Sequence, residues 1–338
     1  MTELVATFLV VALAAYTLFG GADFGGGVLE ATLPSPRLRA RLQATLAPVW
    51  EANHVWLIAV VVILFVGFPK FYAEGLTRLY VPVSLALLAI MVRGTFFTLR
   101  KYDPSPTPAM AGLYSALFRG SSAVAPLFFG FVMAGLQSVH PGGPEGVPSG
   151  YSFSALYLSP WLNAFGLLVG VLVTCLFGYL AAVFFYGELT QAADRELIWH
   201  RIVGFFVATF LLGGLVLGAG AMTGRVPLER GLHPLQLLCQ TIAAAGIVVM
   251  WRARKADSPW LMRLAAGGQV LAILGGWLLV QAPVLLRTER GTLTIYDAAA
   301  PPVTQLWLLV GLVVLLAMVV PALVWLYRVF AAVQAEEH

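Results

Sequence analysis

Charged side chains inside long apolar segments are the first candidates for chemistry in this sequence. Asp23 follows an apolar run, within the glycine-rich stretch 20–27, and Arg93 lies in the middle of another run. A charge at the centre of a bilayer costs at least about 2.5–3.5 kcal/mol, so each needs a structural or functional reason. Asp23 is predicted either to accept hydrogen bonds at a close helix contact or to lie on a proton path. Arg93 is predicted to pair with Asp23, with Glu51 or with an anionic cofactor group, whereas Arg100 is close enough to the end of its run to reach the interface.

The segment 50–56, of sequence WEANHVW, combines two titratable side chains on one helix face, because Glu51 and His54 are three residues apart. A carboxylate in a partly dry site takes up protons more readily than in water, and a histidine titrates near neutrality, so the pair is predicted to pass protons. Trp50 and Trp56 leave open a second interpretation, an interfacial aromatic belt with polar residues at a helix end. Di-iron sites also use Glu-x-x-His but need a second copy, and the sequence has none, so no metal site is predicted.

The elements that position these residues follow from the composition. Of 338 residues, 60% are apolar and 11% charged, against roughly 25% charged in soluble domains. This excludes a water-soluble globular domain, a disordered chain and a disulfide-rich module. We expect an all-α, polytopic membrane protein with about nine transmembrane helices, forming a single membrane domain over residues 1–338. The predicted spans are approximately 4–29, 50–68, 79–99, 114–136, 161–186, 202–220, 233–251, 261–285 and 305–330.

The distribution of positive charge predicts the orientation. With the flanking turns included, 13 Lys and Arg residues belong to the loops after the odd-numbered spans and to the C-terminus, against 6 for the other loops. The positive-inside rule then places the N-terminus outside and the C-terminus in the cytoplasm. The net charge of +4 thus reflects membrane topology, and no nucleic-acid partner is expected. No two histidines lie mid-span, as a transmembrane heme with two histidine ligands requires, so no heme is expected to be ligated by this chain.

Five short motifs, in order along nearly the whole chain, resemble those of one family. They are Gly20-Gly21-Ala22-Asp23 at the end of the first span, Trp50-Glu51-Ala52-Asn53-His54-Val55-Trp56-Leu57 opening the second, Arg93 and Arg100 in the third, the segment 162–168 with Asn163, and the segment 293–298 with Asp297. Together they resemble subunit II of the cytochrome bd quinol oxidases. Gly20 replaces the first acid of the family's first motif, Glu51 replaces an Asp, and His54 stands where the family more often has Glu or Gln.

The resemblance implies a heterodimer with a homologous subunit I, which carries the quinol site and the b-type and d-type hemes and reduces O2 to water. This chain would hold no catalytic residue and no axial heme ligand. It would scaffold subunit I and supply a cytoplasmic proton path, through Glu51, His54 and Asp23, an O2 route, or both. Arg93 and Arg100 would contact an acid or a heme propionate.

The resemblance also implies a multi-pass protein of the bacterial inner membrane, in contact with lipids and quinol. A structural quinone and a small accessory subunit are further candidate partners. Two alternative functions remain, a secondary transporter and a purely structural membrane subunit. A transporter should show paired, interrupted helices in corresponding halves of the chain.

Overall fold

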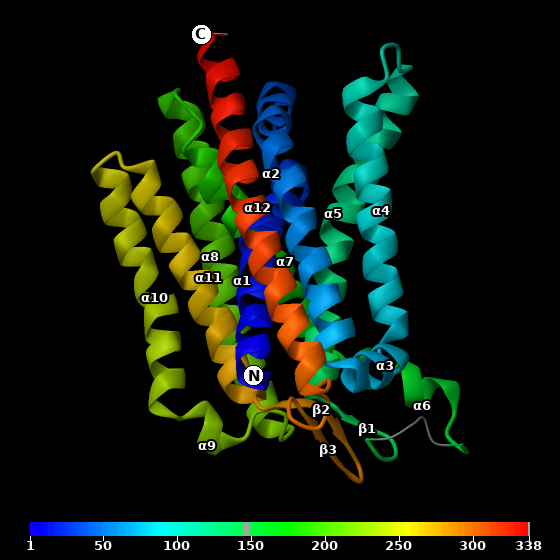
Figure 1. The fold of residues 1–338 in the computed structure, drawn as a ribbon. Coiled ribbons are helices and arrows are strands. Elements are labelled where there is room, and N and C mark those ends of the chain that lie inside the picture. The colour runs from blue at the N-terminus through cyan, green and yellow to red at the C-terminus, as the bar shows by residue number, and fades with distance from the viewer. Residues whose placement is uncertain (145–148, 337–338) are drawn as a thin grey trace.

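The fold is a bundle of long helices with a small sheet at one end (Figure 1). The structure is a computed structural model that describes residues 1–144 and 149–336, without the side chains of 46–52, 228, 320 and 323–336. Within this part, eight helices are long and apolar enough to cross a membrane, or up to nine if a bent pair counts as one span. The prediction of an all-α polytopic membrane protein is therefore confirmed. The long helices are α1 (Thr2–Thr32), α2 (Pro36–Val62), α4 (Tyr80–Tyr102), α5 (Pro108–Gln137), α7 (Ala164–Tyr186), α8 (Ala192–Met222), α10 (Pro234–Lys255), α11 (Pro259–Gln281) and α12 (Pro302–Glu336).

Proline and capping residues mark where these helices begin. Pro occupies the first turn of α2, α5, α10 and α11, where its missing N–H removes no hydrogen bond. Thr107 caps α5 by accepting a hydrogen bond from the Met110 amide. The helix α2 begins at Pro36 rather than at residue 50, because hydropathy detects only the apolar part of a helix and residues 36–49 are more polar. That residues 1–338 form one membrane domain remains a prediction.

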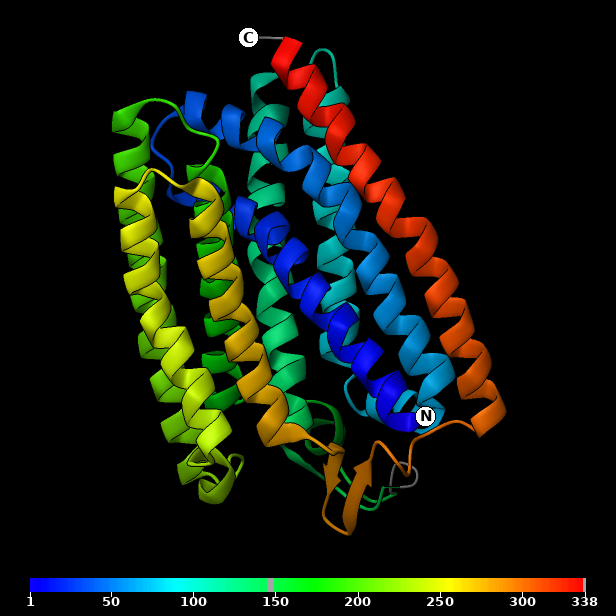
Figure 2. The ribbon, with the colours of Figure 1, turned by 60° about the vertical axis from the view of Figure 1, so that its left-hand side comes forward.

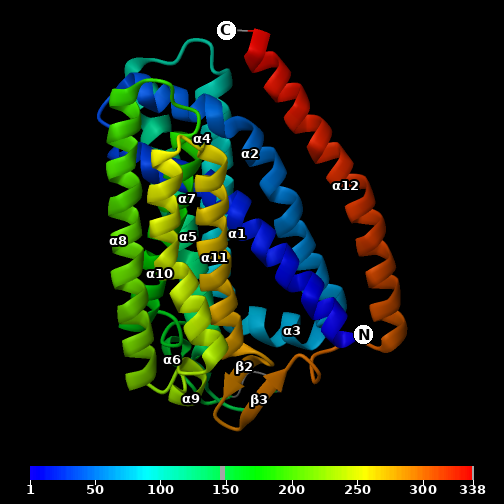
Figure 3. The same cartoon turned by 90° about the vertical axis from the view of Figure 1, so that its left-hand side faces the viewer.

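Two groups of four helices meet along α7. The first group is α1, α2, α4 and α5, and the second is α7, α8, α10 and α11, with α1 and α5 packed on α7. Glycine permits the closest contact: a Cβ on Gly25 of α1 would lie 1.9 Å from the carbonyl oxygen of Phe177 on α7. Small residues allow such backbone approach between membrane helices. The last helix, α12, runs beside α2 and diverges from the bundle toward its C-terminal end (Figure 3).

The chain turns sharply after α2. A short π-helix, η1 (Ile63–Gly67), is followed by α3 (Pro69–Arg78), and the direction changes by 114° between the two helical segments. Pro69 cannot continue the hydrogen-bond ladder of the preceding turn, which accounts for the break. As a result α3 lies across the end of the bundle that also holds the N-terminus (Figure 1).

A three-stranded sheet that the sequence analysis did not predict lies at this same end (Figure 2). Its strands are β1 (Val139–His140), β2 (Val284–Thr288) and β3 (Gly291–Thr294), with β1 parallel and β3 antiparallel to β2. The predicted span 261–285 therefore runs too far, because α11 ends at Gln281 and Pro283 cannot extend a helix. Two short helices, α6 (Phe153–Tyr157) and α9 (Leu228–Gly231), complete this end of the molecule.

Candidate functional site

Two buried carboxylates lie on one face of α1. Asp23 is 0% exposed and Glu30 is 1% exposed. They are seven residues apart, which is about two helical turns, so they lie one above the other about 10.5 Å apart along the helix. The glycine-rich stretch 20–27 packs this part of α1 against neighbouring helices, which leaves the carboxylates without access to solvent. Each carboxylate therefore needs a partner within the protein.

The partners come from α4, where Arg93 and Arg100 are also seven residues apart. Arg93 donates a hydrogen bond to the Asp23 carboxylate and forms an ion pair with it. Arg100 donates to both carboxylate oxygens of Glu30, at 3.0–3.1 Å. Because the spacing is the same on both helices, the two ion pairs form parallel rungs between α1 and α4. We call these four residues the ion-pair ladder.

Aromatic rings of α1, α4 and α5 enclose the arginines. The Arg93 guanidinium carbon lies 5.6 Å from the ring centre of Phe24, 5.2 Å from that of Phe97 and 5.3 Å from that of Phe118. That of Arg100 lies 4.6 Å from the Phe118 ring. Such cation–π contacts contribute about 2 kcal/mol or more each when water is excluded. The rings thus replace water around charges that the helix packing has buried.

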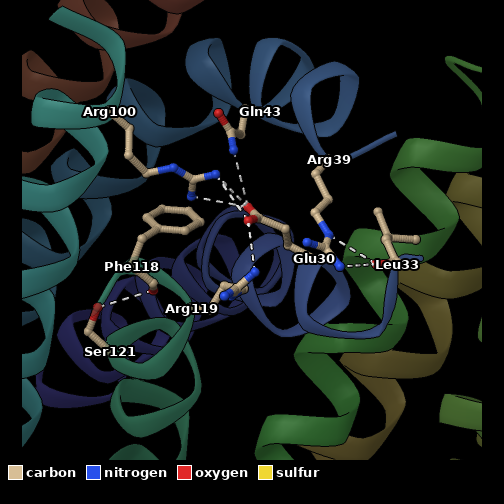
Figure 4. A network of polar contacts seen from close by, with 8 residues as sticks. All are labelled: Glu30, Leu33, Arg39, Gln43, Arg100, Phe118, Arg119 and Ser121. Carbon is tan, nitrogen blue, oxygen red and sulfur yellow. Dashed lines mark hydrogen bonds and ion pairs between the residues drawn. The ribbon is translucent and has the colours of Figure 1, made fainter. Parts of the chain in front are cut away.

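The rung at Glu30 has additional polar neighbours (Figure 4). Arg119 of α5 approaches the Glu30 carboxylate to 3.9 Å, and the Gln43 amide of α2 donates to it at 3.5 Å. Figure 4 shows Glu30 between Arg100 and Arg119, with the Phe118 ring beside the Arg100 guanidinium. The arginines of this rung are also more exposed, since the Arg100 and Arg119 side chains are 9% and 28% exposed, against 1% for Arg93.

The predicted motif of α2 meets the ladder at Asp23. Asn53 is 1% exposed, and its amide nitrogen lies 3.5 Å from an Asp23 carboxylate oxygen, which accepts its hydrogen bond. His54 is half-buried and close enough to Asp23 to interact with it electrostatically. A Cβ on Gly20 would lie 2.9 Å from the Asn53 side-chain oxygen. The glycine at this position therefore makes room for Asn53.

Four other predicted residues belong to the segments 50–56 and 162–168. The side chains of Glu51 and Trp50 fall outside the described residues, so their predicted roles remain predictions. Trp56 is half-buried and packs against the apolar clusters around α1 and α2. Asn163 caps α7 by accepting a hydrogen bond from the Gly166 amide at 3.0 Å.

Asp297 lies in the connection between β3 and α12. Its carboxylate accepts hydrogen bonds from the Thr294 hydroxyl at 2.6 Å and the Thr294 amide at 3.0 Å, and these bonds hold the pKa of Asp297 below its usual range. Asn163 and Asp297 thus stabilise a helix start and a turn, and neither contacts the ladder.

Several buried polar residues escaped the sequence analysis. Glu30 and Arg119 did so because they lie at the ends of apolar runs, although the shared seven-residue spacing of Asp23 and Glu30 and of Arg93 and Arg100 was a usable signal. Arg78 of α3 is 1% exposed and donates to the carbonyls of Pro141 and Gly143, both at 2.8 Å. It thereby ties α3 to the loop after β1.

Three of the described histidines, His140, His200 and His233, make polar contacts with the backbone through a ring nitrogen. His140 is fully buried in β1 with Nε2 2.9 Å from the Gly135 carbonyl oxygen, and burial lowers its pKa to about 4, so the ring is neutral at physiological pH. His200 contacts the Glu196 carbonyl through Nδ1, and Nδ1 of His233 accepts from the Leu235 amide. Within the described part of the chain no three His, Cys, Asp or Glu residues form a metal-binding group. That this chain ligates no heme remains a prediction.

The fold and these charges define a class, namely a polytopic helical membrane protein with buried ion pairs between its spans. The sequence profile of the family "Cytochrome bd terminal oxidase subunit II" matches residues 1–330. This chain therefore belongs to the cytochrome bd terminal oxidase subunit II family, which confirms the resemblance drawn from the motifs.

Sequence and structural similarity to known proteins supports this assignment. The chain is 26% identical over 335 residues to cytochrome bd ubiquinol oxidase subunit 2 of Bacillus subtilis (strain 168), covering 96% of this chain and 94% of that protein. It is 31% identical over 168 residues to cytochrome bd-I ubiquinol oxidase subunit 2 of Escherichia coli (strain K12), covering 48% of this chain and 42% of that one. The fold is similar to a chain in the structure of bd oxidase from Geobacillus thermodenitrificans, with a TM-score of 0.76 and 20% identity over 97% of this chain and 98% of that chain.

The two rungs should differ in their tolerance of substitution. Arg93→Leu leaves the buried Asp23 carboxylate without its ion-pair partner, although the Asn53 hydrogen bond is kept, and breaking a buried pair costs about 3–5 kcal/mol. Arg100→Leu leaves Glu30 beside Arg119 and Gln43, so we expect a smaller loss. The measurement is the yield of monodisperse protein and its midpoint of thermal unfolding in detergent. Equal tolerance of the two substitutions would contradict this account.

Proposed function

We propose that this chain is the subunit of a bd-type quinol oxidase that ligates no heme. It would act with a homologous subunit I, which holds the b-type and d-type hemes, to reduce O2 to water with quinol in the bacterial inner membrane. The observation that carries the proposal is the family match over residues 1–330, together with the ubiquinol oxidase names of the relatives. A structural quinone, membrane lipids and a small accessory subunit are further partners that we expect.

The first role that we propose is to scaffold subunit I. A partner that holds hemes in place needs a rigid neighbour. The ladder supports such a role because it fixes α1 against α4, while α1 and α5 pack on α7 at the centre of the bundle. The helix α7 has the largest buried share of the described spans, which is consistent with a central structural position.

The second role is to supply protons from the cytoplasm. Reduction of O2 to water consumes protons, and an apolar bundle offers few groups that carry them. The charge distribution predicts that the end of the bundle where α1 connects to α2, at residues 33–36, faces the cytoplasm. We propose that Glu51, further along α2, receives protons from that side and that His54 accepts them on the same helix face. Asp23, which is paired with Arg93 and interacts electrostatically with His54, is the third member of the proposed path.

The fold gives little support to the alternative function of a secondary transporter. The bend between η1 and α3 is the single broken span among the described helices, whereas inverted-repeat transporters carry such breaks in both halves. A purely structural subunit is the remaining alternative, and it is separated from the proton-path proposal by substitution of Glu51.

Purification of the chain from native membranes tests the proposed assembly. We expect a tag on this chain to retain a second membrane subunit with the absorbance of b-type and d-type hemes and with quinol oxidase activity. The heme should be lost when the second subunit is removed. Isolation of the chain in a stable complex that has no heme and no quinol oxidase activity would contradict the proposal.

Glu51→Gln tests the proposed proton path, because the amide keeps the size of the side chain and removes its titration. We expect slower quinol oxidase turnover with unchanged heme content, and a factor of about ten or more corresponds to at least 1.4 kcal/mol in the barrier. Glu51→Asp should be tolerated better because it still titrates, and His54→Gln should have a smaller effect. Turnover and membrane potential at wild-type levels in Glu51→Gln would instead favour a structural role for this residue.

A further inference from the structure

A polar cavity of about 260 Å³ lies at the end of the bundle that holds the N-terminus and the sheet. Its lining includes Ser138 after α5, Pro160 before α7, Gly224 after α8, and two arginines, Arg225 and Arg287. All of these residues lie at or beyond the ends of membrane-spanning helices. The cavity is therefore located at the depth where a bilayer has its headgroups.

Each arginine is held by a few contacts that leave most of its donors unused. The Arg225 guanidinium carbon lies 5.0 Å from the ring centre of Phe165, and its Nε donates to the Ser138 hydroxyl at 3.4 Å. Arg287 of β2 donates through one terminal nitrogen to the Arg225 carbonyl oxygen at 3.5 Å. Since a guanidinium has five N–H donors, both side chains keep donors for a ligand in the cavity.

The positive charge of the cavity is not balanced by nearby acids. No carboxylate among the described residues forms an ion pair with Arg225 or Arg287, and Glu289 at the end of β2 is bound to the Gly142 amide and the Tyr151 hydroxyl. Arg230 adds a third positive charge, and burial, followed by the repulsion from Arg230, lowers the pKa of Arg287. Arginine stays protonated at neutral pH, so an anion is the natural counter-charge.

Exposed apolar side chains lie in the cavity lining and next to it in the sequence. Val139, which lines the cavity, is 61% exposed. Met222 precedes the lining residue Thr223 and is 89% exposed, and Leu162 follows the lining residue Pro160 by two positions and is 55% exposed. A lipid brings a phosphate for the arginines and acyl chains for such apolar side chains, whereas a soluble anion uses the arginines alone.

We propose that Arg225 and Arg287 form a binding site for the phosphate of an anionic membrane phospholipid. The planar guanidinium groups donate paired hydrogen bonds to the phosphate oxygens. The lipid tails lie against the exposed apolar side chains of Val139, Leu162 and Met222. The bound lipid thereby joins the ends of α5 and α8 to β2, three elements that are far apart in the sequence.

Lipid retention by the purified membrane complex tests the site. The complex, isolated through a tag on this chain, is placed in phosphatidylcholine vesicles that contain a minor fraction of phosphatidylglycerol, and is then extracted in mild detergent. Native mass spectrometry counts the phosphatidylglycerol molecules that remain bound. We expect Arg225→Gln and Arg287→Gln to reduce this retention about tenfold, since each removes a charged hydrogen-bond donor set.

Arg290→Gln is the matched control, because Arg290 is exposed in the turn between β2 and β3 and does not line the cavity. It should retain the lipid like the wild type. Arg287→Lys keeps the charge and should retain an intermediate amount. If Arg225→Gln fails to fold through loss of its contacts with Ser138 and Phe165, Arg287→Gln still tests the site.

Three results would overturn the proposal. They are equal retention in all variants, displacement of phosphatidylglycerol by a modest excess of inorganic phosphate, which identifies a soluble-anion site, and a carboxylate of another protein chain bound to both arginines in a structure of the complex. The lipid count needs no oxidase activity. Its outcome is therefore independent of the proposed function.

Discussion

The ion pair between Asp23 and Arg93 is the constraint on which the rest of the structure depends. Two charges that are 0% and 1% exposed inside a helical bundle are stable only if they are paired and enclosed. This requires that α1 approach its neighbours closely, and the glycine-rich stretch 20–27 allows it. It also requires a substitute for water around the guanidinium, and the rings of Phe97 and Phe118 supply one.

The same pair positions the polar segment of α2 that contains Asn53 and His54. Because Asp23 accepts a hydrogen bond from Asn53, it holds the polar start of the membrane-crossing part of α2 against α1. The proposed proton path includes His54, which directly follows Asn53 in the sequence. At the end of the bundle that holds the N-terminus, Arg78 joins α3 to the loop after β1. Charged side chains thus join elements both inside the bundle and at one of its ends.

The sequence predicted those features that stand out against an apolar background. Asp23 and Arg93 were recognised because isolated charges interrupt long apolar runs, but their pairing depended on helix packing, which left Glu51 as an equal candidate partner. Glu30 was missed because it lies at the edge of a run, where a charge needs no explanation. The short strands β2 and β3 follow an apolar helix directly, so hydropathy merged the first of them with the span before it.

A double-mutant cycle on the first rung tests the central claim most directly. Asp23→Asn, Arg93→Gln and the double substitution would be compared with the wild type by their free energies of unfolding in the same detergent. If the pair organises the bundle, the double substitution should be less destabilising than the sum of the two single ones by about 2 kcal/mol or more. Additive effects within about 0.5 kcal/mol would contradict the claim and would show that Asp23 and Arg93 act independently.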